Sequence, residues 1–206
     1  MNPKSIVAHG YDHIAEQYAA WSSQAGAGER AQYTAHLIER LPAGAHVLEL
    51  GCGTGVPTAQ TLAQHFRVIG VDISSVSIDL ARKNVPAASF RVSDMTALDF
   101  PSATFDAIIA FYSIIHVPRD EQAELLCRIT AWLKPGGTFI ATMGSTSNEA
   151  QIEADWLGTP MYWSHFDADK NQNLIRAAGL TIQSADVQTD MEDGSPVSFL
   201  WVVATK

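Results

Sequence analysis

The sequence predicts an α/β fold, a three-layer sandwich in which helices cover both faces of a mainly parallel sheet. Short apolar segments alternate along the chain with segments whose apolar residues recur every three or four positions, as is typical of such sheets. The segment 105–111 has the apolar centre Ile108-Ile109-Ala110, which is expected of a strand buried on both faces. Two strand-like segments follow each other at the end of the chain and predict a closing hairpin.

The chain begins with two expected helices. In 5–21, large side chains from Tyr11 to Trp21 recur at steps of three and four and mark one helix face. A second helix is expected over 28–41, where Pro42 ends it. We therefore expect 1–43 to form a helical cap on a single domain that spans the whole chain.

Strands and helices alternate in the rest of the chain. Pro57 fits the first turn of a helix, Ser74 or Ser75 can cap the next one, Asp167 can cap the last, and Gly179 suits its end. The expected strands are 46–50, 67–72, 88–92, 105–111, 138–143, 180–188 and 197–204, and the expected helices between them are 57–65, 75–84, 119–133 and 168–179.

Two stretches have a weaker pattern. Residues 144–166 are less regular, and we expect a lid-like insertion there. Asp193-Gly194 is a hairpin turn pair, expected within a longer loop between the last two strands.

Composition restricts the class of protein. The chain has 206 residues, 47% of them hydrophobic, which suits one domain with a real core. Its formal net charge of −9, without a basic run, disfavours DNA and RNA as partners. Two cysteines make no disulfide framework, the first residues do not form a signal peptide, and no apolar run is long enough to span a membrane. We therefore expect a cytoplasmic protein that contacts no membrane.

A glycine-rich loop follows the first expected strand, in Glu49-Leu50-Gly51-Cys52-Gly53-Thr54-Gly55. Glycines allow tight turning and close approach of a ligand, because no Cβ intervenes. The dinucleotide fingerprint would need its third glycine at position 56, which is Val56. Glu49 would repel a pyrophosphate and suits a ligand with a positive charge. The alternative is a plain strand-to-helix turn, for which one glycine would suffice.

Carboxylates also follow the next two strands. Asp72 lies about 20 residues beyond the first glycine, where a carboxylate can accept both hydroxyls of a ribose. The alternative is a helix N-cap, which Ser74 already offers. Asp94 and Met95 come shortly after the third strand, where they can hold an exocyclic amine and flank an adenine ring, although Asp also begins many turns.

These motifs together resemble the class I S-adenosylmethionine (SAM) dependent methyltransferases. The matching segments are Val47–Gly55, Gly70–Ser74, Asp94-Met95, Phe105–Ile109 and Leu133–Thr138. The resemblance covers 44–143 with specific motifs and 166–205 by pattern. It implies a seven-stranded sheet whose last strand is inserted antiparallel, and SAM as the cofactor.

The resemblance also implies roles at the cofactor. Gly51, Gly53 and Gly55 would approach the methionine part and the ribose, and Glu49 would lie near the ammonium group. The other residues that we expect at the cofactor are Tyr11, Tyr18, Cys52, Asp72, Ile73, Asp94, Met95 and Phe111.

The acceptor side is less determined. The Asn-Pro-Pro-Tyr type sequence of many methylases that act on nucleic acids and proteins is absent, which favours a small-molecule acceptor. His116 is the first candidate for a general base and His165 the second, because imidazole titrates near neutral pH. The alternative for His116 is a pocket histidine that only packs or hydrogen-bonds. Positioning alone can supply much of the rate, so a base is needed only if the acceptor must lose a proton.

Aromatic side chains gather outside the motifs. In the family, the first helix and an insertion such as 144–166 cover the substrate, so we expect a lid there and an aromatic lining that suits a flat, apolar or cationic acceptor. The expected acceptor residues are Trp21, Tyr112, Tyr162 and Trp163. The alternative for each is ordinary core packing. We expect no metal site, and a monomer or a homodimer.

The main functional hypothesis is therefore methyl transfer from SAM to a small organic molecule. One alternative is a SAM-binding protein without transferase activity, and another is methylation of a protein or nucleic acid. The glycine spacing opposes a nicotinamide oxidoreductase.

Overall fold

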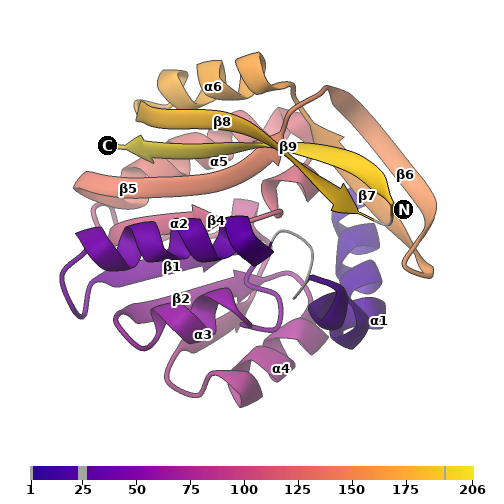
Figure 1. Ribbon diagram of the computed structural model, residues 1–206, viewed down its shortest axis with the longest axis horizontal. Coiled ribbons are helices and arrows are strands. Elements are labelled where there is room, and N and C mark those ends of the chain that lie inside the picture. The colour runs from indigo at the N-terminus through magenta and orange to yellow at the C-terminus, as the bar shows by residue number, and fades with distance from the viewer. Residues whose placement is uncertain (1, 23–26, 193) are drawn as a thin grey trace.

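A computed structural model describes residues 2–22, 27–192 and 194–206. The elements are α1 (Pro3–Ser22), α2 (Ala27–Arg40), β1 (His46–Leu50), α3 (Thr58–Leu62), β2 (Arg67–Asp72), α4 (Ser75–Asn84), β3 (Ser89–Val92), β4 (Phe105–Ala110), α5 (Arg119–Trp132), β5 (Leu133–Gly144), β6 (Asn148–Trp156), β7 (Thr159–His165), α6 (Ala168–Ala177), β8 (Thr181–Glu192) and β9 (Ser195–Thr205). The central sheet has seven strands in the order β3-β2-β1-β4-β5-β9-β8, and β9 is antiparallel to both its neighbours (Figure 1). The predicted fold class is confirmed.

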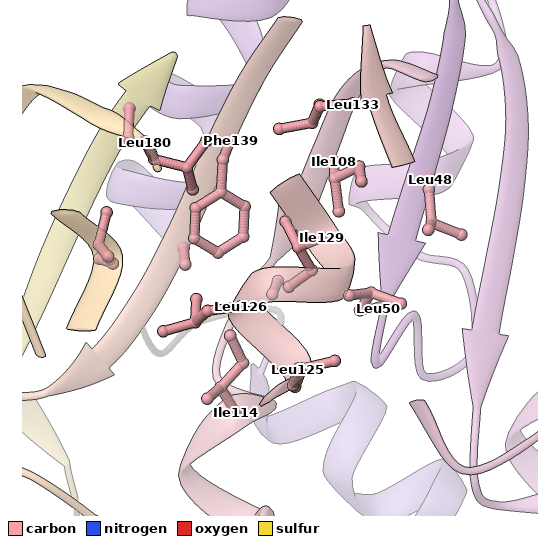
Figure 2. Packing of buried hydrophobic residues seen from close by; sticks show 14 of the residues in the cluster. Leu48, Leu50, Ile108, Ile114, Leu125, Leu126, Ile129, Leu133, Phe139 and Leu180 are labelled. Atoms are coloured by element: carbon pink, nitrogen blue, oxygen red, sulfur yellow. The ribbon is translucent and has the colours of Figure 1, made fainter. Parts of the chain in front are cut away.

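Apolar cores on the two faces of the sheet hold the sandwich together. On one face, α5 and α6 cover a core in which Leu126 and Ile129 pack among Leu48, Ile108 and Phe139 (Figure 2). On the other face, buried residues of α2, α3 and α4 form a second core. Side chains alternate along a strand, so β1 contributes to both cores and its residues are buried on both faces.

The first helix lies beside the insertion, at one end of the sheet (Figure 1). Ile6, Val7 and Ile14 of α1 form a third buried cluster with Met161 and Tyr162 of β7. This packing places α1 over the carboxyl ends of the parallel strands.

The insertion 144–166 is more regular than its sequence pattern indicates. β6 and β7 pair antiparallel as a two-stranded ribbon outside the main sheet. Most residues of β6 are exposed, so the strand has no apolar period that sequence analysis could detect.

Several element ends differ from the expected ones. The helix α3 stops at Leu62 instead of reaching position 65, and the last hairpin extends to Glu192 and resumes at Ser195, so the longer loop is absent. Of the expected turn pair, Asp193 lies outside the described residues, and Gly194 has a positive φ of 80°. No helix in the described part of the chain is both long and apolar enough to cross a lipid bilayer.

Candidate cofactor and acceptor site

A cavity of about 690 Å³ lies where the first four strands of the parallel sheet end. Most of the residues predicted to hold the cofactor line it, although they come from five separate segments of the chain. Its walls include Tyr11, Tyr18, Gly51, Gly53, Asp72, Ile73, Asp94, Met95 and Phe111. A crevice at this edge of an open α/β sheet is where such folds bind ligands.

The glycine loop and Asp72 are connected directly. One carboxylate oxygen of Asp72 accepts a hydrogen bond from the Gly53 amide at 2.8 Å, and the other accepts from the Ser74 amide at 2.9 Å. Burial raises the pKa of Asp72, and these amide bonds oppose that effect. Ser74, as expected, caps α4 through its own hydroxyl. Asp72 is therefore not the helix cap, and it instead binds the glycine loop and lines the cavity.

The three glycines have different roles. A Cβ on Gly51 would meet the Ser113 Cβ at 2.2 Å, so this glycine allows the segment after β4 to cross the loop. A Cβ on Gly53 would meet no atom within 4 Å, which leaves the loop backbone open to a ligand. A Cβ on Gly55 would meet Phe90 and residues of α4 and its end at 3.2–3.3 Å, and Gly55 lines none of the cavities described here. Gly55 therefore serves helix–strand packing.

A second hollow of about 420 Å³ opens on the other side of the loop, lined by Glu49, Cys52, Gly53 and Arg30 among others. Glu49 is 4% exposed, and its Oε2 atom has no hydrogen-bond partner among the described residues. Burial raises the pKa of Glu49 to about 8; Arg30 opposes this rise and Asp72 adds to it.

The polar groups around the loop fit the cofactor that the motifs imply. A buried acceptor without a partner costs free energy until a ligand donor reaches it, and an ammonium group is such a donor. Beside it stand an open glycine backbone and a carboxylate suited to a ribose. An ammonium-bearing nucleoside such as SAM matches this set, whereas a pyrophosphate would meet Glu49.

Asp94 has a partner that sequence analysis missed. The ammonium group of Lys4 in α1 lies 2.7 Å from Asp94 Oδ2 and also pairs with Glu121. Partial burial opposes ionisation of Asp94, but the bonds from Lys4 and Thr96 outweigh it and lower its pKa. Lys4 lines the large cavity, so α1 is anchored at the expected adenine end.

A third hollow, of about 350 Å³, adjoins the large cavity and has mainly aromatic walls. Of the predicted acceptor residues, Trp21, Tyr112 and Trp163 line it, and Trp156 joins them from the ribbon. Tyr162 is buried in the cluster beneath α1 and lines none of the three cavities.

The two candidate histidines lie in different places. His116 borders both the large cavity and the aromatic hollow, where its Nε2 lies 2.9 Å from the Tyr11 hydroxyl. Its Nδ1 lies 2.8 Å from the backbone carbonyl of Tyr162, and burial lowers the pKa of His116 to about 4. His165 hydrogen-bonds the Thr146 carbonyl and lines none of the three cavities.

The described residues contain no cluster of side chains that could hold a metal ion. Among residues 2–22, 27–192 and 194–206, no three or more His, Cys, Asp or Glu side chains are grouped to hold a metal ion.

Comparisons with known proteins find similarity to methyltransferases. A family model described as a methyltransferase domain matches residues 47–137. A demethylmenaquinone methyltransferase of Symbiobacterium thermophilum is 31% identical over 170 residues, which are 76% of this chain and 64% of that protein. The chain spans about half the length of other curated relatives that it matches.

Solved structures share the fold across nearly the whole chain. A 1,6-didemethyltoxoflavin-N1-methyltransferase of Burkholderia thailandensis, solved with S-adenosylhomocysteine (SAH), has a TM-score of 0.66 at 24% identity, covering 97% of this chain and 90% of its own. The cyclase SpnF has a TM-score of 0.73 at 18% identity, covering 97% and 94%.

The fold, with its cavity at the ends of the parallel strands, is that of an α/β domain of the class that binds SAM. Residues 47–137 match the methyltransferase-domain family, and the whole chain shares the fold of solved SAM-dependent methyltransferases.

Proposed function

We propose that the protein transfers a methyl group from SAM to a small organic molecule. The observation that carries this proposal is Glu49, a buried carboxyl whose Oε2 lacks a partner among the described residues, beside an open glycine loop. A ligand ammonium group would supply the hydrogen-bond donor that Glu49 Oε2 lacks. The curated relatives that match include methyltransferases named for a quinone and for trans-aconitate, which supports a small acceptor.

Different residues would bind different parts of SAM. Glu49 would hold the ammonium group, Gly53 would admit the ligand to the loop backbone, Asp72 would accept the ribose hydroxyls, and Asp94 with Met95 would hold the adenine. When bound, SAM supplies a methyl group activated by a positively charged sulfur. The protein contributes position and exclusion of water.

The aromatic hollow is our proposed acceptor site, and α1 with the β6–β7 ribbon is its lid. Trp21 reaches the hollow from α1, and Trp156 and Trp163 reach it from the ribbon. Its concave and mainly aromatic wall suits a small organic molecule. The net charge of −9 disfavours a nucleic acid.

We place this reaction in the cytoplasm. Cys52 is buried, Cys127 is exposed, and both are free thiols, as suits a reducing compartment.

Binding of SAH should release about one proton from Glu49 near pH 6.5. The raised pKa of about 8 means that the free, folded protein keeps this carboxyl protonated at that pH. A ligand ammonium favours the ionised form, so the proton leaves on binding. Calorimetry in buffers with different heats of ionisation measures the released protons.

The matched variant is Glu49→Gln, which keeps the shape and cannot ionise. We expect no proton release and an affinity for SAH about 10- to 150-fold lower, as for a lost charged hydrogen bond of about 1.5–3 kcal/mol. Without ligand, the stability of the parent relative to that of Glu49→Gln should fall as the pH rises from 4.5 towards 8, because the unfolded chain ionises this carboxyl freely and the folded protein does not. Equal proton release by both proteins would contradict the assignment of Glu49.

One observation supports the alternative, a SAM-binding protein without transferase activity. The structural neighbour SpnF is named as a cyclase, so this fold alone does not imply methyl transfer. Detection of a methylated product separates the two functions.

A further inference from the structure

Tyr11 and His116 stand at the junction between the large cavity and the aromatic hollow. Both side chains border both spaces, so they lie where a cofactor and an acceptor would meet. The Tyr11 hydroxyl lies 2.9 Å from His116 Nε2, and the two rings meet edge to face with centroids 5.4 Å apart. The pair is formed by residues that are distant in the sequence, one from α1 and one from the segment after β4.

The direction of these hydrogen bonds follows from the chemistry of the partners. The Tyr162 carbonyl can only accept, so His116 Nδ1, at 2.8 Å, must carry the hydrogen. Burial lowers the pKa of His116 to about 4, so the ring is neutral and Nε2 has a free lone pair. Tyr11 therefore donates its hydroxyl hydrogen to Nε2. Its hydroxyl also shares a hydrogen bond with Tyr18, which occupies one lone pair of the Tyr11 oxygen and leaves the other for a donor in the cavity.

We propose that Tyr11 accepts the hydroxyl proton of a hydroxyaromatic acceptor and passes its own proton to His116 Nε2. This inference rests on the proposed function and adds the substrate class. Tyr11 is then a catalytic residue that touches the acceptor, and His116 acts through it.

The bonds and charges of the step balance. The acceptor O–H bond breaks as a new O–H bond forms on Tyr11, while the original Tyr11 proton bonds to His116 Nε2. The acceptor oxygen forms its bond to the methyl carbon of the sulfonium donor, and the bonding pair stays on the sulfur. One positive charge is lost at the donor and one appears on His116, so the net charge of the site does not change.

A weakly basic histidine suffices for this role. An oxygen that is gaining a methyl group becomes strongly acidic unless it loses its proton, so even a buried imidazole can take the proton as the new bond forms. The Tyr162 carbonyl, which accepts from Nδ1, stabilises the ring once it is charged. A prior, complete removal of the proton is not required.

The walls of the hollow give the substrate class. The Trp163 ring lies 4.5 Å from the His116 ring, and Trp156 lies 6.0 Å from Tyr11, both measured between centroids. Trp21 also lines the hollow, and Arg30 and Glu192 are the charged residues of its wall. Flat aromatic rings fit such surroundings by stacking and by edge contacts, and the hydroxyl of such a ring can then reach Tyr11.

The first test measures binding without turnover. The probes are 2-naphthol and its methyl ether, 2-methoxynaphthalene, titrated into the complex with SAH and followed by fluorescence. The parent should prefer the naphthol over the ether, and Tyr11→Phe should reduce this preference about 3- to 10-fold by removing the hydroxyl's partner. Tyr33→Phe is the control, because Tyr33 stacks on Trp201 and lines none of the three cavities.

The second test separates hydrogen bonding from proton uptake. His116→Gln offers Tyr11 an amide oxygen but cannot accept a proton, so it should keep the naphthol preference. Its single-turnover rate with SAM and 2-naphthol should fall about 10²- to 10⁴-fold, and Tyr11→Phe should fall similarly. Thermal unfolding of each variant shows that it is folded.

Each contrary outcome is specific. An unchanged naphthol preference in Tyr11→Phe overturns the contact with the acceptor, and a parental rate in His116→Gln overturns the proton transfer. A parent that binds SAH but neither probe, or binds 2-naphthol without methylating it, overturns the substrate class while the proposed function stands. A parent that does not bind SAH removes the proposed function itself.

Discussion

Gly53→Val should lower the affinity for SAH about 100-fold while the domain remains folded. The Cβ of residue 53 would point into space that no atom within 4 Å occupies, so the protein itself meets no clash. Gly53 lines both the large cavity and the second hollow. We therefore expect the two methyl groups of a valine to occupy space where the ligand approaches the loop backbone. Calorimetry with SAH, together with thermal unfolding, measures both effects.

The variant needs a control for backbone strain. Gly53 has a φ of 52°, a region that a β-branched residue adopts at a cost of about 1–3 kcal/mol. Gly136 also has a positive φ, of 77°, and open space around its Cβ, but it lies in β5 away from the three cavities. Gly136→Val should therefore lose similar stability and keep its SAH affinity. A folded Gly53→Val protein with parental affinity would refute the close approach of the ligand.

Asp72→Ala should lower SAH affinity about 10- to 150-fold, since charged hydrogen bonds are worth about 1.5–3 kcal/mol. Asp72 supports the glycine loop through the Gly53 amide, and it lines the large cavity. The loss therefore combines a missing ligand contact with a loosened loop, and the two must be separated.

An analogue of SAH without the two ribose hydroxyls separates them. The parent should bind this analogue more weakly than SAH, whereas Asp72→Ala should bind both alike, because the carboxylate partner is gone. Asp99→Ala removes an exposed carboxylate outside the cavities and serves as the charge control. If Asp72→Ala discriminates between the two ligands as the parent does, the ribose lies elsewhere.

The parts of the site that sequence analysis predicted are those with a local signal. Gly51, Gly53, Asp72 and Asp94 each follow a strand, and parallel strands bring their carboxyl ends to one edge of the sheet. Chain order and strand pattern were therefore enough to assemble them. Gly55 has the same local signal and serves packing instead, a difference that only the neighbouring Phe90 reveals.

The missed features depend on contacts between distant segments. The bond from Lys4 to Asp94 and that from His116 to the Tyr162 carbonyl join α1 or the ribbon to the sheet, and no local pattern encodes them. Asp12 is a similar case, since it accepts from the Ser74 hydroxyl and the Val76 amide and so ties α1 to α4. The β6–β7 ribbon was missed because backbone pairing, not an apolar face, defines it.

The central claim, methyl transfer to a small molecule, is tested most directly with SAM labelled in its methyl group. The protein is incubated with this SAM and a cell extract that is then separated into small molecules and acid-precipitable macromolecules. We predict label in the small-molecule fraction, dependent on Glu49 and Gly53, and none above background in the macromolecules. Label confined to protein or nucleic acid, or no transfer by a protein that binds SAM, would contradict the claim.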